Sequence, residues 1–171
     1  MKKVKAAFHA KSIYDVPISF FRHLGIKAVV SDLDNTLDTY DVSSPGQKAF
    51  ILKESLEREG ISLLIVSNNT KGRVREYCEK LGVHYLYDSR KFMKGRIARF
   101  LKKEGYDVNE CLFVGDQLFT DRIYVRKLKG RLLLTEPLSE KDQFFTRFVR
   151  RLDVRIRKKW LKKGLLGPSA E

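Results

Sequence analysis

The chain has 171 residues, of which 43% are hydrophobic and 33% charged, a balance typical of a soluble globular domain with a sizeable core. It carries 35 Lys and Arg against 21 Asp and Glu, which gives a formal net charge of +14. Such a charge predicts an anionic partner, which can be a phosphorylated substrate, an anionic membrane surface or nucleic acid. No stretch approaches the roughly 18 apolar residues of a membrane span.

Residues 6–11 are too polar for the hydrophobic segment of a signal peptide, and the two cysteines form no disulfide framework. We therefore expect a cytoplasmic protein with one domain over residues 1–171.

Short apolar runs rich in β-branched residues alternate with amphipathic stretches along the chain. The runs predict strands at residues 26–31, 61–67, 83–87, 111–115 and 131–135. The amphipathic stretches predict helices near residues 45–58, 71–81, 91–104 and 118–129. This alternation favours a Rossmann-like, three-layer α/β fold with a five-stranded parallel sheet and helices on both faces.

Two aspartates, Asp32 and Asp34, follow the first predicted strand at a spacing of two. The carboxyl ends of parallel strands are where α/β proteins hold their ligands. One carboxylate at such a place can attack phosphorus and help to hold a magnesium ion, while the other donates and accepts a proton. The pair alone is a weak signal, but together with the partners that the rest of the chain supplies it predicts a phosphatase.

The second and third predicted strands end in residues that suit a phosphate. Ser67 and Asn68 follow the second strand, where a hydroxyl and backbone N–H groups can bind a phosphoryl oxygen. A cation after the third strand can neutralise the charge of nucleophile and phosphate. Lys91 is the favoured residue, and Arg90 and Lys94 remain open alternatives.

The fourth predicted strand ends in a Gly-Asp pair. Asp116 offers an oxygen ligand to a hard cation such as Mg²⁺. Asp121 lies inside the next predicted helix, so we expect it to orient the site from outside the ligand shell. Asp38 and Asp41 lie in the loop after the first strand, and we expect solvated side chains for both.

The string Asp-Leu-Asp-Asn-Thr-Leu at residues 32–37 resembles motif I of the haloacid dehalogenase (HAD) phosphatase superfamily, and Gly-Asp-Gln-Leu-Phe-Thr-Asp at residues 115–121 resembles its motif IV. The resemblance implies that Asp32 is the nucleophile, which forms an aspartyl-phosphate, and that Asp34 is the general acid and base. It also implies that Asp32, the main-chain carbonyl of Asp34, and Asp116 bind Mg²⁺.

By the same resemblance, Ser67 matches motif II and Lys91 matches motif III, with Thr36 and Asn68 completing the phosphate-binding set. The related pattern has Lys-Pro at the third motif where this chain has Lys-Phe, which is why Arg90 and Lys94 stay open. The gaps between motifs hold one helix and one strand each. They leave no room for the cap domain that many superfamily members insert, so we expect an open, capless site of subclass IIIA.

A basic amphipathic helix is predicted at about residues 139–161. Its apolar residues recur every four positions, at Phe144, Phe148, Leu152, Ile156 and Trp160. Residues 141–171 carry ten Lys and Arg against three acidic residues, a net charge of +7 and half of the total. Such a helix can pack on the domain through its stripe, or dock on an anionic membrane surface. We expect residues 164–171 to be frayed.

A closer resemblance covers nearly the whole chain. The strings at residues 11–15, 31–37, 115–121 and 136–141 resemble the capless bacterial YqeG family, which is grouped with mitochondrial phosphatidylglycerophosphate phosphatases. This implies removal of the terminal phosphate of phosphatidylglycerophosphate at the cytoplasmic face of the membrane. Two alternatives remain: a soluble phosphatase of a nucleotide, sugar phosphate or phosphoprotein, and a nucleic-acid- or ribosome-associated protein with accessory phosphatase activity.

Overall fold

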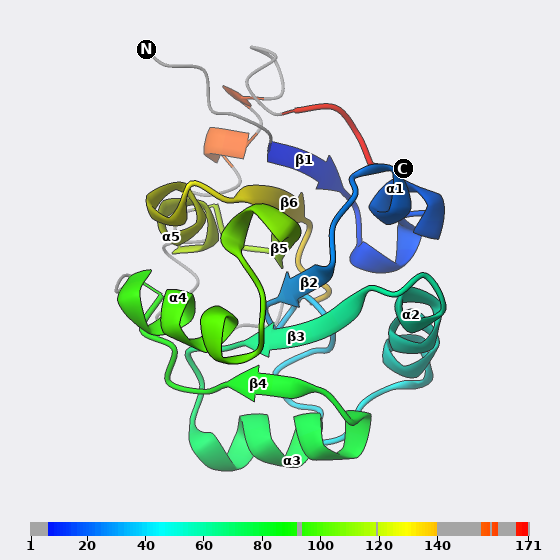
Figure 1. Ribbon diagram of the computed structural model, residues 1–171, viewed down its shortest axis with the longest axis vertical. Coiled ribbons are helices and arrows are strands. Elements are labelled where there is room, and N and C mark those ends of the chain that lie inside the picture. The colour runs from blue at the N-terminus through cyan, green and yellow to red at the C-terminus, as the bar shows by residue number, and fades with distance from the viewer. Residues whose placement is uncertain are drawn as a thin grey trace.

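The computed structural model describes residues 7–91, 94–118, 120–139, 155–157, 159–160 and 167–170. Six strands form one parallel sheet in the order β1-β6-β5-β2-β3-β4 (Figure 1). The strands are β1 Ala7–Ala10, β2 Ala28–Ser31, β3 Ser62–Val66, β4 His84–Leu86, β5 Cys111–Gly115 and β6 Arg131–Thr135. The helices are α1 Ile18–His23, α2 Gln47–Arg58, α3 Lys71–Leu81, α4 Lys94–Lys103 and α5 Thr120–Leu128, with short 3₁₀ turns at Ile13–Asp15 and Val108–Glu110.

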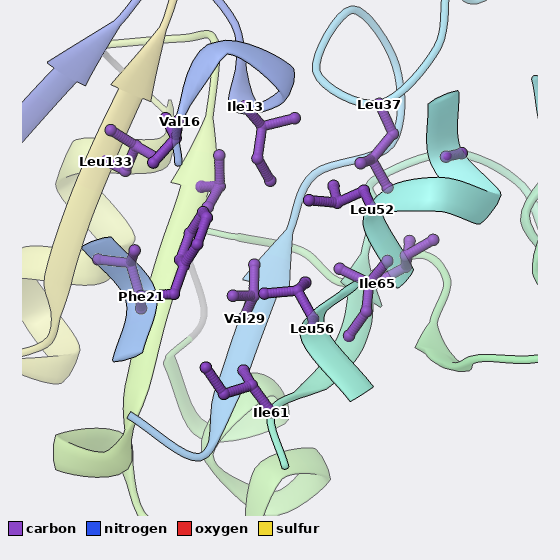
Figure 2. Packing of buried hydrophobic residues seen from close by; sticks show 14 of the residues in the cluster. Ile13, Val16, Phe21, Val29, Leu37, Leu52, Leu56, Ile61, Ile65 and Leu133 are labelled. Atoms are coloured by element: carbon purple, nitrogen blue, oxygen red, sulfur yellow. The ribbon is translucent and has the colours of Figure 1, made fainter. Parts of the chain in front are cut away.

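Helices cover both faces of the sheet, as predicted. Successive strand residues point to opposite faces, so Val29 joins the core cluster under α1, α2 and α3, while Val30 joins the cluster under α4 and α5. Figure 2 shows the first cluster, in which Leu56 of α2 and Phe21 of α1 pack around Val29. Both faces are therefore apolar, which confirms the three-layer α/β fold.

The sheet has six strands where the sequence predicts five. The additional strand, β1, lies at the edge beside β6, with Ala7 opposite Leu132 and Ala10 opposite Thr135. Its four residues, Ala-Phe-His-Ala, contain no β-branched residue, so no local pattern indicates a strand. Residues 7–10 form a strand because they pair with β6, which lies far along the chain.

Residues 167–170 lie against this edge strand. His9 forms a parallel bridge with Ser169, and the amide of Ala170 donates a hydrogen bond of 2.9 Å to the carbonyl of His9. Ala170 itself is buried in the first core cluster. The expectation of a frayed terminus is therefore wrong for residues 167–170, because the main chain gains β-type partners there.

Of the predicted helix at 139–161, only residues 155–157 and 159–160 are described beyond Ser139, and these five are helical. Ile156 and Trp160 pack against the cluster under α4 and α5. The guanidinium of Arg122 lies 4.3 Å from the centre of the Trp160 ring. This part of the apolar stripe thus faces the domain, while Phe144, Phe148 and Leu152 lie outside the described residues. Among the described residues, no helix is both long and apolar enough to cross a membrane.

The order of the strands reverses between β2 and β5, which lie side by side. From β2 the chain builds β3 and β4 on one side, and it then returns to build β5 and β6 on the other. Ligands of open α/β sheets bind at such a switch point, outside the carboxyl ends of the strands. Asp32 follows β2 and Asp116 follows β5, so both stand at this point. The segments 37–66 and 68–90, all described, hold no cap.

Candidate active site

Four charged side chains form what we call the buried floor of the site: Asp32, Lys91, Asp116 and Asp121. The Nζ of Lys91 lies 2.7 Å from Oδ2 of Asp32 and 2.7 Å from Oδ1 of Asp121. All four residues are buried. A buried charge is stable only when it is compensated. The two ion pairs therefore hold the side chains of Lys91, Asp32 and Asp121 in place.

The loop after β4 delivers Lys91 to the floor. The Oδ1 atom of Asn68 accepts hydrogen bonds from the Lys91 amide at 3.1 Å and from the Ser89 hydroxyl at 2.8 Å. The side chain of Arg90 points away, is 60% exposed and pairs with Asp88 at 3.2 Å. The structure therefore brings Lys91 and not Arg90 to Asp32. The side chain of Lys94 lies outside the described part.

Asp32, Asp116 and Asp121 each offer a carboxylate oxygen, and these three oxygens lie within 4.8 Å of one another. Both oxygens of Asp121 already accept a hydrogen bond, one from Lys91 and the other from the amide of Gln117 at 2.9 Å. A side chain on Gly115 would overlap the Asp121 carboxyl group, so only glycine fits at that position. The glycine of the Gly-Asp pair thus lets the helix carboxylate approach the strand end.

Burial and the neighbouring charges together shift the pKa values of Lys91 and Asp32. Burial by itself would lower the pKa of Lys91, but the carboxylates of Asp121 and Asp32 outweigh it and raise that pKa. Burial raises the pKa of Asp32, and Asp121 adds to the rise while Lys91 opposes it. Since an amine binds a proton several pH units more tightly than a carboxyl group, the proton belongs on Lys91.

The second group is what we call the rim, made of Asp34, Asn69 and Arg73 together with the loop at residues 38–46. Asn69 donates from Nδ2 to Oδ2 of Asp34 at 3.0 Å, and Arg73 donates from Nη2 to Oδ1 at 3.1 Å. The Arg73 guanidinium also donates to the main-chain carbonyls of Thr39 and Val42. The rim therefore ties the Asp34 carboxylate to α3 and to the loop.

Asp38 does not have the solvated side chain that the sequence predicts. Its Oδ2 accepts hydrogen bonds from the amide of Gly46 at 3.0 Å and from the hydroxyl of Tyr77 at 2.6 Å. The contact with α3 lies far along the chain, so no local pattern indicated it. Asp41 is exposed, as expected, and accepts a hydrogen bond from Thr39.

Between floor and rim lies a cavity of about 300 Å³. Its lining residues are Asp32, Asp34, Asn35, Tyr40, Ser67, Asn68, Asn69, Lys91, Gln117 and Thr120. Thr36 does not line it. The backbone turns at Asn35, whose φ of 62° is left-handed, and the Thr36 amide bonds back to Leu33, which leaves Thr36 buried beneath the loop. The expectation that Thr36 binds phosphate is therefore not supported by its position.

A residue of the tail reaches the same region. Arg157 donates from Nη1 to the carbonyl of Thr135 at 2.8 Å and from Nη2 to the carbonyl of Asp116. Arg157, in the helical segment 155–157, therefore contacts the main chain at the ends of β5 and β6.

The sequence did not predict four residues near the site, which are Tyr40, Asn69, Arg73 and Arg157. In a chain with 35 basic residues, a single arginine carries no signal of its own. The one available hint was the position of Asn69, which follows Ser67 and Asn68 at the end of the second predicted strand.

Known proteins resemble the chain in sequence, and solved structures resemble it in fold. No family model matches it. "Probable phosphatase YqeG" of Bacillus subtilis (strain 168) is 30% identical over 154 residues, which cover 90% of each chain. Phosphatidylglycerophosphate phosphatase 1, chloroplastic/mitochondrial, of Arabidopsis thaliana is 32% identical over 156 residues, which cover 82% of this chain and 43% of that protein.

Solved structures share the fold at low identity. A protein from Legionella pneumophila assigned to the HAD superfamily, subfamily III A, has a TM-score of 0.51 at 17% identity, covering 83% of this chain and 90% of that one. The cobalt-bound deoxy-D-mannose-octulosonate 8-phosphate phosphatase of Haemophilus influenzae has a TM-score of 0.51 at 15% identity, covering 68% and 81%.

The chain thus shares the fold of the solved HAD-superfamily structure, and this fold, the carboxylates at the switch point and the sequence relatives together define a phosphatase. Within that class, the identity and coverage shared with the Bacillus subtilis protein place the chain in the YqeG family.

Proposed function

We propose that the protein hydrolyses a phosphomonoester through an aspartyl-phosphate, with Asp32 as the nucleophile and Asp34 as the general acid and base. The observation that carries this proposal is the buried ammonium of Lys91, 2.7 Å from Asp32 and aimed at the same cavity. A fixed positive charge beside the nucleophile offsets the repulsion between a carboxylate and an incoming phosphate dianion.

A divalent cation fits the floor. The buried charged side chains of the described residues are three carboxylates and one ammonium, so a charge of +2 would balance them. Oxygen donors of this kind suit Mg²⁺. We propose Asp32, Asp116 and the main-chain carbonyl of Asp34 as its ligands. Asp121, whose two oxygens are engaged, would orient Lys91. When bound, the ion supplies Lewis-acid stabilisation of the phosphoryl oxygens.

The residues of the chain carry the rest of the reaction. An oxygen of Asp32 bonds to phosphorus while the bond from phosphorus to the ester oxygen breaks, and Asp34 gives that oxygen a proton. Asp34 then takes a proton from the water that attacks the aspartyl-phosphate, which frees inorganic phosphate and restores Asp32. Ser67 and Asn68, at the end of β3, lie where they can bind the phosphoryl oxygens.

We propose phosphatidylglycerophosphate as the substrate, with phosphatidylglycerol as the product. Water takes about 30 Å³ per molecule, so a cavity of about 300 Å³ accommodates a phosphorylated glycerol headgroup but not the acyl chains. The chains would remain outside, along the exposed Tyr40 and Val42 of the rim loop. The net charge of +14 favours an anionic surface. The relative from Arabidopsis thaliana bears the name of this activity.

In this proposal the protein acts as a peripheral enzyme at the cytoplasmic face of the membrane. The exposed Arg155 and Lys159 of the tail would contact anionic lipid headgroups, because the apolar residues Ile156 and Trp160 are engaged with the domain. The cavity volume also suits a small soluble phosphate ester, such as a sugar phosphate, which is the second candidate class.

The test is phosphate release from phosphatidylglycerophosphate in mixed micelles with Mg²⁺, beside a panel of sugar phosphates, nucleotides and aryl phosphates. We expect turnover of the lipid to exceed that of the panel, to stop on addition of EDTA and to return with Mg²⁺. Turnover of the panel without preference for the lipid would support the second candidate. Activity that survives complete chelation would contradict the metal-dependent mechanism.

A further inference from the structure

Arg73 makes three hydrogen bonds at the rim, all through its two terminal nitrogens, while its buried Nε has no hydrogen-bond partner among the described residues. Its guanidinium donates to Oδ1 of Asp34 at 3.1 Å, to the carbonyl of Thr39 at 3.2 Å and to the carbonyl of Val42. Its central carbon lies 5.7 Å from the centre of the Tyr77 ring. The side chain is 14% exposed. One residue of the first turn of α3 thus holds the Asp34 carboxylate and two points of the loop together.

The ring of Tyr77, which the Arg73 guanidinium contacts, is itself held in place. Tyr77 is fully buried, and its hydroxyl donates to Asp38 at 2.6 Å. The planar guanidinium can satisfy several acceptors in one fixed arrangement, which the flexible ammonium of a lysine cannot reproduce. Asn69 fixes the other oxygen of Asp34 at 3.0 Å. Both oxygens of the Asp34 carboxylate therefore have set positions.

We propose that Arg73 is a positioning residue that holds the Asp34 carboxyl group where it can pass a proton to the leaving oxygen of the substrate. The inference rests on the proposed role of Asp34. Arg73 does not line the cavity, and three of its contacts are made to the protein's own oxygens. It therefore acts through Asp34 and not on the phosphate.

The effect expected from loss of Arg73 depends on the leaving group of the ester. The electron pair of the bond between phosphorus and the ester oxygen goes to the leaving oxygen, which takes a proton from Asp34. An alkoxide is a strong base and needs that proton as the bond breaks, whereas p-nitrophenolate is a weak base and leaves without it. Displacing the proton donor by about 1 Å can cost on the order of 10²-fold in rate. Loss of Arg73 should therefore slow alkyl esters far more than aryl esters.

The experiment measures kcat/KM of the full chain with Mg²⁺ for p-nitrophenyl phosphate and for two alkyl esters, glycerol phosphate and phosphatidylglycerophosphate in micelles. We expect Arg73→Ala to lose roughly tenfold to a hundredfold more on the alkyl esters than on the aryl ester. Arg73→Lys should lie between this variant and wild type. Arg75→Ala, an exposed arginine two residues along the same helix, should match wild type on all three.

Equal losses of Arg73→Ala on alkyl and aryl esters would overturn the inference and leave Arg73 a structural residue. If Arg73→Ala does not fold, Arg73→Lys carries the test, and an unchanged ratio between the ester classes overturns the inference. Asp34→Asn serves as the benchmark. If Asp34→Asn itself shows no difference between the ester classes, then the proposed role of Asp34 fails, which is a separate result from failure at Arg73 alone.

Discussion

The buried floor and the rim each pair an aspartate with a cationic side chain, yet the two pairs stand in different surroundings. In the floor, the Lys91 side chain is 2% exposed and the Asp32 side chain 11%. In the rim, the Arg73 side chain is 14% exposed and the Asp34 side chain 22%. Breaking a buried pair leaves an uncompensated charge away from water, whereas water reaches more of the outer pair.

This difference in exposure fits the catalytic roles proposed for Asp32 in the floor and Asp34 in the rim. A nucleophile must stay in one place while phosphate arrives, and the floor holds Asp32 between Lys91 and the Leu33 amide, which donates to its Oδ1 at 2.9 Å. An acid and base must exchange protons with a leaving group and with water, and this requires access from the cavity. Variants of the two groups should therefore fail in different ways.

The largest effect is expected at the nucleophile. Asp32→Asn should lower kcat by on the order of 10⁴-fold or more, because an amide cannot form the aspartyl-phosphate. The change removes one of three buried negative charges, so the metal-free variant should unfold at no lower temperature than wild type. Phosphate release with Mg²⁺ checks the first statement, and thermal unfolding in EDTA checks the second. Retention of more than a few per cent of activity would contradict the role of Asp32.

The floor should also show a large effect on stability. Lys91→Met leaves Asp32 and Asp121 buried without their shared cation, which is expected to lower the free energy of unfolding by about 3–5 kcal/mol. Urea unfolding in EDTA measures this. The matched control is Arg90→Met, because that neighbouring side chain is 60% exposed and should change the free energy by less than about 0.5 kcal/mol. A loss of the same size in both variants would show that the floor is not the cause.

A smaller effect is expected where the tail touches the floor. Arg157→Ala removes a charged donor from the Asp116 carbonyl. Hydrogen bonds from charged donors contribute about 1.5–3 kcal/mol, so we expect the free energy of unfolding to fall by about that amount, as measured by urea unfolding in EDTA. Arg155→Ala, an exposed arginine in the same helical segment, should leave that free energy unchanged. An unchanged free energy in Arg157→Ala would mean that this contact does not hold the tail on the strand ends.

The smallest effect is expected at the outer side of the rim. Tyr40→Ala should lower turnover of phosphatidylglycerophosphate in micelles about fivefold, because partial burial of such a ring contributes roughly 1 kcal/mol, and it should spare p-nitrophenyl phosphate. Phe50→Ala is the control, since Phe50 is 37% exposed and Tyr40 36%, but Phe50 lies on α2 and does not line the cavity. An equal loss on the aryl ester would place Tyr40 in the chemistry and not in lipid contact.

Many of the helices and strands could be predicted from the sequence. The helix predicted at 71–81 is observed at Lys71–Leu81, since Thr70 precedes it and Gly82, with a φ of 72°, ends it. The strand predicted at 111–115 is observed at Cys111–Gly115 because an unbroken apolar run suits a strand that is buried on both faces. By contrast, β1 was not predicted, because its four residues form a strand only beside β6 and Ser169.

The sequence by itself determined that carboxylates follow two strands, that a serine and a lysine follow two others, and that these strands are parallel. From these facts the meeting of Asp32, Ser67 and Asp116 follows, because the carboxyl ends of neighbouring parallel strands meet at one edge. Only the tertiary structure decided that Lys91 and not Arg90 enters the floor, that Arg73 holds Asp34 across 39 positions of sequence, and that Arg157 reaches Asp116. The physical reason is that such contacts depend on how loops and helices pack around the sheet, and a basic side chain carries no local pattern that reveals its partner.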